Sequence, residues 1–220
     1  SGVEFITGEL LPLISDLDHI PSPYLSGLCD KLLSQNLVPL VQFVRGCPFA
    51  CTFCQDGDEY YNRVRRFSFD RVKEELSYLA KKSKAQTLQC GDLNFGMYEE
   101  DLEICREIAS VQRKHGWPKH FEGVVGKNKK ERILEATSII RQTFFSAAVQ
   151  STDEQVLKNV KRSNISIEKM FDIVQEAKKS QTTGFSELIL GLPGDTKEGH
   201  IRSNAELMDA EIDIIRSHQF

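Results

Sequence analysis

Long apolar runs are absent from this chain, and so are several other features that would place it in a special class. No stretch approaches the roughly 18 residues of a membrane span. The first residues lack the charged-then-apolar pattern of a secretion signal. Internal repeats and low-complexity segments are also missing. We therefore expect a globular protein with no role for a membrane.

An excess of basic charge is missing as well. The 28 Lys and Arg residues face 32 Asp and Glu residues, for a net charge of −4, so a broad nucleic-acid footprint is not expected. One local basic cluster, Arg63, Arg65 and Arg66, fits a solvated face as well as it fits anion binding. The hydrophobic content of 40% is ordinary for a domain with one substantial core.

Regularly spaced cysteines are lacking, since the six in this chain do not form a disulfide framework. Three of them nevertheless lie within eight residues, as Cys47, Cys51 and Cys54 in R-G-C-P-F-A-C-T-F-C. Thiolates at this spacing on one loop can surround a single inorganic centre, and a 4Fe–4S cluster is normally held by four. The next cysteines, Cys90 and Cys105, are far away, so one iron would stay open to bind a small molecule. A reducing cytoplasm suits such thiolates.

Other readings of the same loop remain open. Structural zinc needs four closed ligands, and no histidine lies between His19 and His115, so zinc would need a distant partner. A zinc-stabilised interaction module, an iron–sulfur electron carrier or redox sensor, and buried thiols without metal are the alternatives to an enzyme.

The motif C-x₃-C-x₂-C, with Phe53 before its last cysteine, resembles the signature of the radical S-adenosylmethionine (radical SAM) enzymes. The flanks V-P-L-V-Q-F-V-R-G and I-P-S-P-Y-L-S-G (20–27) are similar to the subgroup whose radical domain follows a cobalamin-binding domain.

The resemblance implies a 4Fe–4S cluster held by the three cysteines, with SAM chelated to the open iron through its amino and carboxylate groups. It implies reductive cleavage of SAM to a 5′-deoxyadenosyl radical that abstracts hydrogen from a small-molecule substrate. Electrons would come from a donor such as flavodoxin or ferredoxin. Methyl transfer through cobalamin, bound by a domain outside this chain, is a further subtype. No residue stands out as a catalytic acid, base or nucleophile.

Apolar runs alternate with amphipathic stretches from residue 38 onward, which predicts βα units around a parallel sheet. Strands are predicted at 38–44, 87–89, 120–125, 143–149, 187–190 and 212–215. Helices are predicted from Ser68, over 98–114 and 130–136, from a capping box of Thr152 and Gln155, from Ser166 and from about Thr196.

Six such units predict an α/β fold, a TIM-like partial (β/α)6 barrel of parallel strands, which the resemblance also implies. A complete eight-stranded barrel takes about 250 residues. Residues 1–37 are predicted to be a linker or N-terminal extension. Residues 38–220 are predicted to be the radical SAM partial barrel, truncated at its C-terminus, with further domains missing on both sides.

Polar residues follow the predicted strands, where active sites of parallel barrels form. Gly91 and Asp92 occupy the place of the family's Gly-Gly-Glu-like turn, and the resemblance implies that they hold the ammonium group of SAM. Cys90 stands in place of the first glycine there and Asp92 in place of glutamate. A plain turn fits these residues equally well.

The segment A-V-Q-S-T-D-E-Q-V-L-K-N-V-K-R resembles the family's fourth-strand region. On that match Gln150 and Ser151 would contact ribose hydroxyls, and Arg162 would pair with the carboxylate of SAM. The alternative is that they end a strand, cap a helix and face solvent. The turn containing Gly191 and Pro193 is expected to support adenine, with Phe53 as a further contact. Cys29, Cys90 and Cys105 receive no role.

Overall fold

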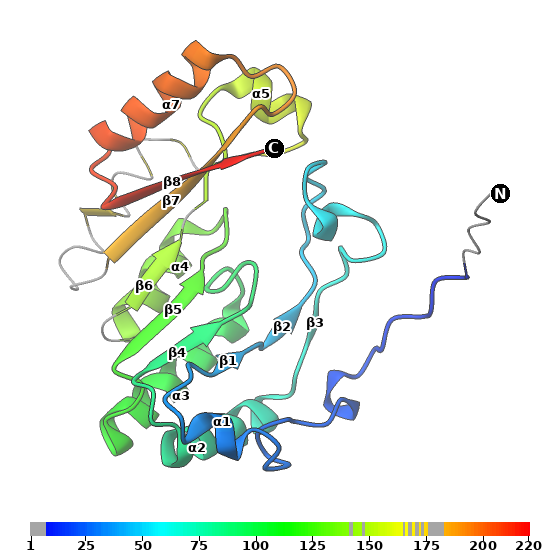
Figure 1. Ribbon diagram of the computed structural model, residues 1–220, viewed down its shortest axis with the longest axis vertical. Coiled ribbons are helices and arrows are strands. Elements are labelled where there is room, and N and C mark those ends of the chain that lie inside the picture. Colours follow the sequence, from blue (N-terminus) through cyan, green and yellow to red (C-terminus); the bar gives the residue numbers. More distant parts are fainter. Residues whose placement is uncertain are drawn as a thin grey trace.

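Six parallel strands form the main sheet of the molecule, in the order β1-β4-β5-β6-β7-β8 (Figure 1). The computed structural model describes residues 8–140, 143–146, 148–164, 166, 169, 172, 174–175 and 183–220, and of residues 130, 143–146 and 183 the backbone alone. The strands are β1 (Leu40–Val41), β4 (Thr87–Cys90), β5 (His120–Val124), β6 (Thr143–Ser146), β7 (Thr183–Leu190) and β8 (Ile214–Gln219). Every neighbouring pair is parallel, which confirms the predicted α/β class.

Helices connect the strands and cover one face of the sheet. They are α1 (Asp30–Leu33), α2 (Phe69–Lys82), α3 (Glu99–His115), α4 (Lys130–Ile139), α5 (Glu154–Asn159) and α7 (Lys197–Asp209), with 3₁₀ turns η1 (Leu17–His19) and η2 (Gln55–Gly57). Helix α2 begins as predicted, because the Ser68 hydroxyl accepts a hydrogen bond from the Arg71 N–H. Helix α7 begins in the same way at Thr196, whose side chain accepts from Gly199.

The two faces of the sheet differ in composition. Side chains that point toward the helices are apolar and buried, such as Leu88 and Phe121 in the main core. Leu188 does the same on β7, where it packs against Val149 and Leu207 of α7. Alternating side chains point to the opposite, concave face, as expected from the period of two along a strand.

The apolar run 38–44 does not form one strand, contrary to expectation. After β1 the chain leaves the main sheet, and β2 (Val44–Arg45) pairs antiparallel with β3 (Arg65–Arg66). The hairpin stands apart from the main sheet in Figure 1. Buried Asp92 explains the departure, because its Oδ1 accepts hydrogen bonds from the Phe43 and Val44 N–H groups at 2.8 and 3.0 Å. These two donors are therefore satisfied without strand pairing.

The capping box predicted from Thr152 and Gln155 is wrong. Asp153 is the N-cap of α5, and its carboxylate accepts from the Gln155 and Val156 N–H groups. The Thr152 hydroxyl instead lies 2.8 Å from the Ser203 hydroxyl of α7.

Three further predicted strands have bounds that differ from those observed by two residues or more. Strand β6 ends at Ser146 instead of residue 149, β7 begins earlier, at Thr183, and β8 covers Ile214–Gln219 instead of 212–215. The helix predicted from Ser166 falls largely on residues outside the described ranges.

The basic cluster after the cysteine loop contacts the protein itself. Arg66 donates to the buried carboxylate of Asp101 at 2.9 Å and stacks on the ring of Tyr98. Arg65 donates to the carbonyl oxygen of Ile14 at 2.7 Å. These two arginines therefore anchor the hairpin and the N-terminal segment, whereas Arg63 is exposed, as in the alternative of a solvated face.

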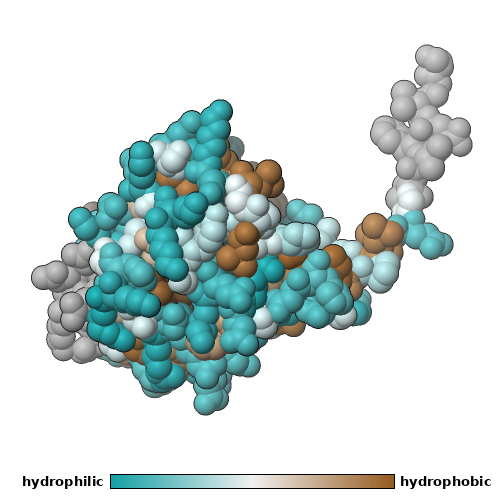
Figure 2. All heavy atoms as spheres, turned by 90° about the horizontal axis from the view of Figure 1, so that it is seen from below, coloured by the Kyte–Doolittle hydropathy of each residue, from teal (hydrophilic) through white to brown (hydrophobic). Residues whose placement is uncertain are grey.

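The first 37 residues are partly packed against the barrel. Leu17 and Leu33 are buried, and the Tyr24 hydroxyl donates to the carbonyl oxygen of Leu40 at 2.6 Å. Leu10 and Leu11 are 75% and 78% exposed, although the Tyr60 hydroxyl donates to the carbonyl oxygen of Leu11 at 2.6 Å. The N-terminal arm reaches away from the body in Figure 2. The domain boundary at residue 37 stays a prediction. Within the described ranges, no helix has the length and apolar character to cross a membrane.

Candidate iron-sulfur and cofactor site

The three loop cysteines line one cavity of about 250 Å³ at the carboxyl ends of the strands. The other walls come from the segments that follow β4, β5 and β6 and from Glu187 on β7. All three are free thiols; Cys51 is buried and Cys54 is exposed. The three cysteines thus line one space, and their role as cluster ligands stays a prediction.

Two glycines allow the cysteine loop to fold this closely. A Cβ atom at Gly46, where φ is +94°, would lie 2.2 Å from the carbonyl oxygen of Arg63. A Cβ atom at Gly57 would lie 2.3 Å from the carbonyl oxygen of Cys51. The loop is also tied to the segment after α5, because the Thr52 N–H donates to the carbonyl oxygen of Val160 at 3.1 Å. Only glycine fits these two positions without displacing the loop.

Three polar side chains from different elements are directed at the cysteine sulfurs. Asn94 Nδ2 lies 3.3 Å from the sulfur of Cys47, and Lys127 Nζ lies 2.9 Å from that of Cys51. The Arg162 guanidinium is 4.0 Å from the Cys51 sulfur. Burial lowers the pKa of Lys127 and of Arg162, and the neighbouring cysteines oppose this by favouring the charged forms.

The donor set fits an iron–sulfur cluster. Thiolates are the ligand form of cysteine, and neighbouring cations favour them. Within the described residues, no group of three or more His, Cys, Asp or Glu side chains lies close enough to ligate one metal ion. A cluster distributes its thiolates over different irons, so Cys47, Cys51 and Cys54 could hold it without converging on one atom. A structural zinc site would need four side chains around one ion, and the described residues do not provide such a group.

Arg162 is fixed by a small polar network at the mouth of the barrel. Its Nε donates to Asn164 Oδ1 at 2.7 Å, and its terminal nitrogen donates to the carbonyl oxygen of Ala148. The Asn164 amide in turn donates to the carbonyl oxygens of Val149 at 2.6 Å and Ser151 at 3.1 Å. One guanidinium nitrogen faces the cysteine, so the group is oriented before any ligand arrives.

Gln150 adopts a strained backbone conformation beside this network. Its φ is +68°, in the left-handed region that non-glycine residues rarely occupy. Its N–H donates to the carbonyl oxygen of Glu187, and its own carbonyl oxygen accepts from Ile189, both at 2.8 Å. The side-chain Oε1 is buried without a hydrogen-bond partner. A buried amide oxygen in this position suits a ligand donor such as a hydroxyl group.

Asp92 lies outside the cavity lining. Its side chain is 2% exposed, its Oδ1 binds the two N–H groups before the cysteine loop, and its Oδ2 has no partner. Burial raises the pKa of Asp92 to about 7. Gly91 likewise contacts β1, through the carbonyl oxygen of Val41. Their expected contact with the ammonium group of SAM stays a prediction.

The remaining predicted residues divide into two groups. Phe53 lines the cavity and also packs against Val160 and Leu192. Ser151, Gly191 and Pro193 are not among the residues that line the cavity. Ser151 is buried and accepts from the Asp153 N–H, and the carbonyl oxygen of Pro193 accepts from Asn159. Their roles toward SAM also stay predictions.

Cys90 and Cys105 behave as buried hydrophobic residues in the main core. Burial raises the pKa of both thiols well above the ordinary value, so they stay protonated. This agrees with assigning them no ligand role.

Four polar residues of the cavity were missed by sequence reasoning: Asn94, Lys127, Asn164 and Glu187. Asn94 and Lys127 follow the second and third strands of the barrel in chain order. Position alone could have flagged them, because segments after parallel strands meet at one end of the sheet.

Comparison with known proteins agrees with this geometry. The model of the radical SAM superfamily matches residues 41–203. A 2-(S-pantetheinyl)-carbapenam-3-carboxylate methyltransferase of Streptantibioticus cattleyicolor is 30% identical over 95% of this chain and 32% of its own length. The cobalamin-dependent radical SAM methyltransferase TokK of Streptomyces tokunonensis is 28% identical over the same shares.

A solved structure has a similar fold. The radical SAM methyltransferase TsrM from Kitasatospora setae, with cobalamin and a [4Fe-4S] cluster bound, superposes with a TM-score of 0.71 and 13% identity, covering 86% of this chain and 35% of that one.

The chain belongs to the radical SAM superfamily, because the family model spans most of its length. Enzymes of this superfamily use a 4Fe–4S cluster to cleave SAM reductively. The chain spans about a third of the length of these two curated relatives.

Replacing Gly57 by Ala should disturb the cysteine loop. The new Cβ would meet the Cys51 backbone at 2.3 Å, and such overpacking costs about 1–3 kcal/mol. We expect lower iron uptake on anaerobic reconstitution and a lower midpoint of urea unfolding. Gly184→Ala is the control, since its Cβ would meet only Asp213, at 3.9 Å. Equal iron uptake by the two variants would contradict this account of the loop.

Asp92 should make stability depend on pH. Its pKa of about 7 in the folded protein lies above the unfolded value of about 3.9, so the folded state binds an extra proton between these values. The free energy of unfolding contributed by Asp92 should therefore fall as pH rises from about 4 through about 7. Asp92→Asn keeps an acceptor oxygen for Phe43 and Val44 but does not titrate.

Urea unfolding at pH 5 and pH 8 checks this difference. The wild type should lose more stability between the two pH values than Asp92→Asn does, whereas the exposed control Asp70→Asn should follow the wild type. The same loss in wild type and Asp92→Asn would show that this carboxyl group does not titrate in the window.

Proposed function

We propose that this chain is the radical domain of a cobalamin-dependent methyltransferase. The observation that carries the proposal is the similarity along 95% of the chain to two methyltransferases, one of which is named as cobalamin-dependent and radical SAM. When bound together, the cluster, SAM and cobalamin would supply radical formation and a carrier for the methyl group. The cobalamin would be held by a domain outside this chain.

The residues of the cavity support the proposal through what they bind and orient. Cys47, Cys51 and Cys54 would hold the cluster, and Arg162, already oriented by Asn164, would pair with the carboxylate of SAM. The unpartnered Oε1 of Gln150 would accept a hydrogen bond from the ribose. A small one-electron donor such as flavodoxin or ferredoxin would reduce the cluster, and a reducing cytoplasm would keep the thiols free.

The side chains on the concave face of the sheet indicate the chemical class of the substrate. Gln89 pairs in register with Glu122, and Glu187 pairs with Arg216, so polar side chains share this face and reach toward the cavity that Glu187 lines. Bulky apolar side chains normally fill the interior of a complete parallel barrel. These polar side chains, which lie on the same face as apolar residues such as Phe185 and Ile214, favour a small-molecule substrate that carries polar groups over a lipid.

Arg216 suggests one group of that substrate. Its guanidinium lies 4.6 Å from the ring centroid of Phe185, which holds it in place on exposed β8. Within the described part of the chain it has no ion pair, because Glu187 contacts His218 instead. An oriented guanidinium of this kind suits a carboxylate. We propose a substrate that carries one, as does the substrate named for the carbapenam relative.

Product analysis tests the reaction. The chain is reconstituted anaerobically with iron and sulfide, then incubated with dithionite, SAM and hydroxocobalamin. Chromatography should detect 5′-deoxyadenosine with the wild type and with the control Cys29→Ala, but not with Cys51→Ala. S-adenosylhomocysteine should form only when the cobalamin is present. Without 5′-deoxyadenosine the radical assignment fails, and S-adenosylhomocysteine formed equally with and without cobalamin contradicts methyl transfer through cobalamin.

Binding tests the substrate class. With 2-(S-pantetheinyl)-carbapenam-3-carboxylate as the probe, calorimetry should show binding that Arg216→Ala weakens by roughly 10-fold, the loss of one hydrogen bond to a charged group. Arg106→Ala, on the outer face of α3, should bind like the wild type. Saturable binding of a fluorescent sterol in place of the acid would contradict a polar substrate.

A further inference from the structure

Lys127 is the polar residue closest to a cluster ligand. Its Nζ lies 2.9 Å from the sulfur of Cys51, a sulfur with little access to water because Cys51 is 5% exposed. The nearest other cation, the Arg162 guanidinium, is more distant at 4.0 Å and already donates to Asn164 and Ala148. Lys127 is thus the cation that faces this sulfur directly.

The position of Lys127 is fixed from two sides. Its ammonium group lies 3.9 Å from the ring centroid of Phe49, within the cysteine loop itself. The preceding residue, Gly126, packs so closely that a Cβ atom there would lie 2.6 Å from the side chain of Met97. The backbone before Lys127 is therefore held against Met97, in the segment that precedes α3, and the Lys127 side chain is held against the cysteine loop.

No carboxylate competes for the ammonium group of Lys127 within the described residues, where neither an ion pair nor a hydrogen bond joins it to Asp or Glu. Its charge in this half-buried cavity is offset by sulfur and by an aromatic ring. A cation held in this way acts on the cluster ligand through a short contact, where water screens it little.

We propose that Lys127 is a positioning residue for the iron–sulfur cluster. Lys127 donates a hydrogen bond to the Cys51 thiolate that holds the cluster, and this makes the cluster easier to reduce. The inference rests on the proposed cluster site. Reduction adds a negative charge, and a neighbouring cation stabilises the reduced form more than the oxidised form. Hydrogen bonds to the sulfurs and net charge are known determinants of cluster potential. The general function of the superfamily does not require a lysine at this place.

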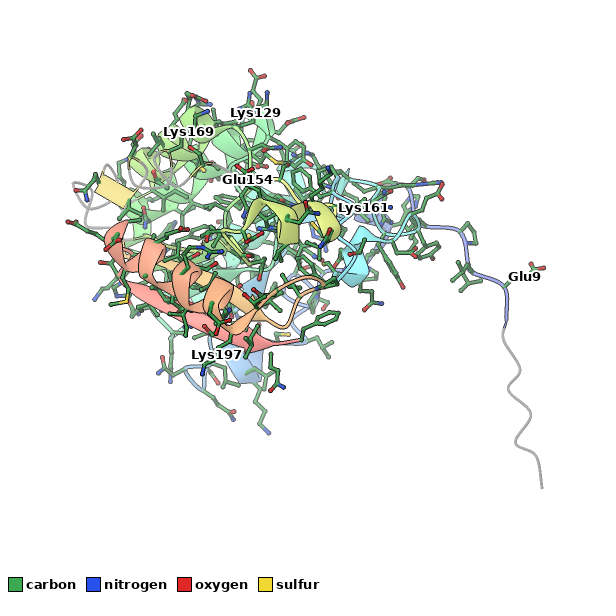
Figure 3. The ribbon with its side chains drawn as sticks, turned by 90° about the horizontal axis from the view of Figure 1, so that it is seen from above. Glu9, Lys129, Glu154, Lys161, Lys169 and Lys197 are labelled. Carbon is green, nitrogen blue, oxygen red and sulfur yellow. The ribbon has the colours of Figure 1, made fainter. Side chains whose placement is uncertain are left out.

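The test compares reduction potentials of reconstituted variants. Lys127→Gln removes the charge, Lys127→Arg keeps it, and Lys129→Gln is the control, since Lys129 is exposed two residues further on and lies on the outer surface in Figure 3. Iron per chain is measured first, and the midpoint potential then follows from a redox titration monitored by electron paramagnetic resonance without SAM.

We expect a more negative midpoint potential for Lys127→Gln, a potential near that of the wild type for Lys127→Arg, and no change for Lys129→Gln. An unchanged potential in iron-loaded Lys127→Gln would overturn the inference, and so would an equal shift in Lys129→Gln. Weaker SAM binding at an unchanged potential would also overturn it, because Lys127 would then serve SAM instead of the cluster.

A variant that loads little iron still gives an answer. Loss of iron in Lys127→Gln with retention in Lys127→Arg supports the role of the charge in holding the Cys51 thiolate. Equal loss in both variants overturns it, because the shape of the side chain would then matter more than its charge. Failure of the wild type to take up iron would instead refute the proposed cluster site.

Discussion

As ligands of a cluster, the three cysteines in this cavity would be thiolates that repel one another, and the arrangement of the site would offset this charge. Lys127 and Arg162 supply positive charge beside Cys51, and the Asn94 amide donates to Cys47. These groups come from segments after three different strands. They can meet only because all six strands are parallel and end at the same side of the sheet. The fold is thus the means by which distant donors reach one short loop.

The two faces of the sheet have different roles: one stabilises the fold and the other leads into the cavity. The face toward the helices carries the apolar side chains that stabilise the fold, such as Leu88, Phe121 and Leu188. The concave face carries polar groups that the core does not need, and it continues into the cavity through Glu187. Asp92 links the two, since it is buried beside the core yet fixes the backbone that leads into the cysteine loop.

Local patterns in the sequence predicted most of the described helices and the parallel sheet, because each depends on residues close in the chain. The hairpin of β2 and β3 was not predictable in this way, since the run 38–44 is almost continuously apolar and only the distant Asp92 diverts it. The N-cap of α5 was mistaken because Thr152 and Asp153 are both good caps, and packing of Thr152 on Ser203 decides between them. Lys127 belongs to no recognisable sequence motif, and only the fold places it beside Cys51.

Mössbauer spectroscopy of the chain reconstituted with ⁵⁷Fe tests the central claim, that three cysteines hold a four-iron cluster with one iron left for SAM. The account predicts about four irons per chain, the number in a 4Fe–4S cluster, of which one changes its isomer shift when SAM is added. Cys29→Ala should give the same spectra. A cluster whose irons all stay unchanged on addition of SAM would contradict it, as would a chain that binds zinc and no iron.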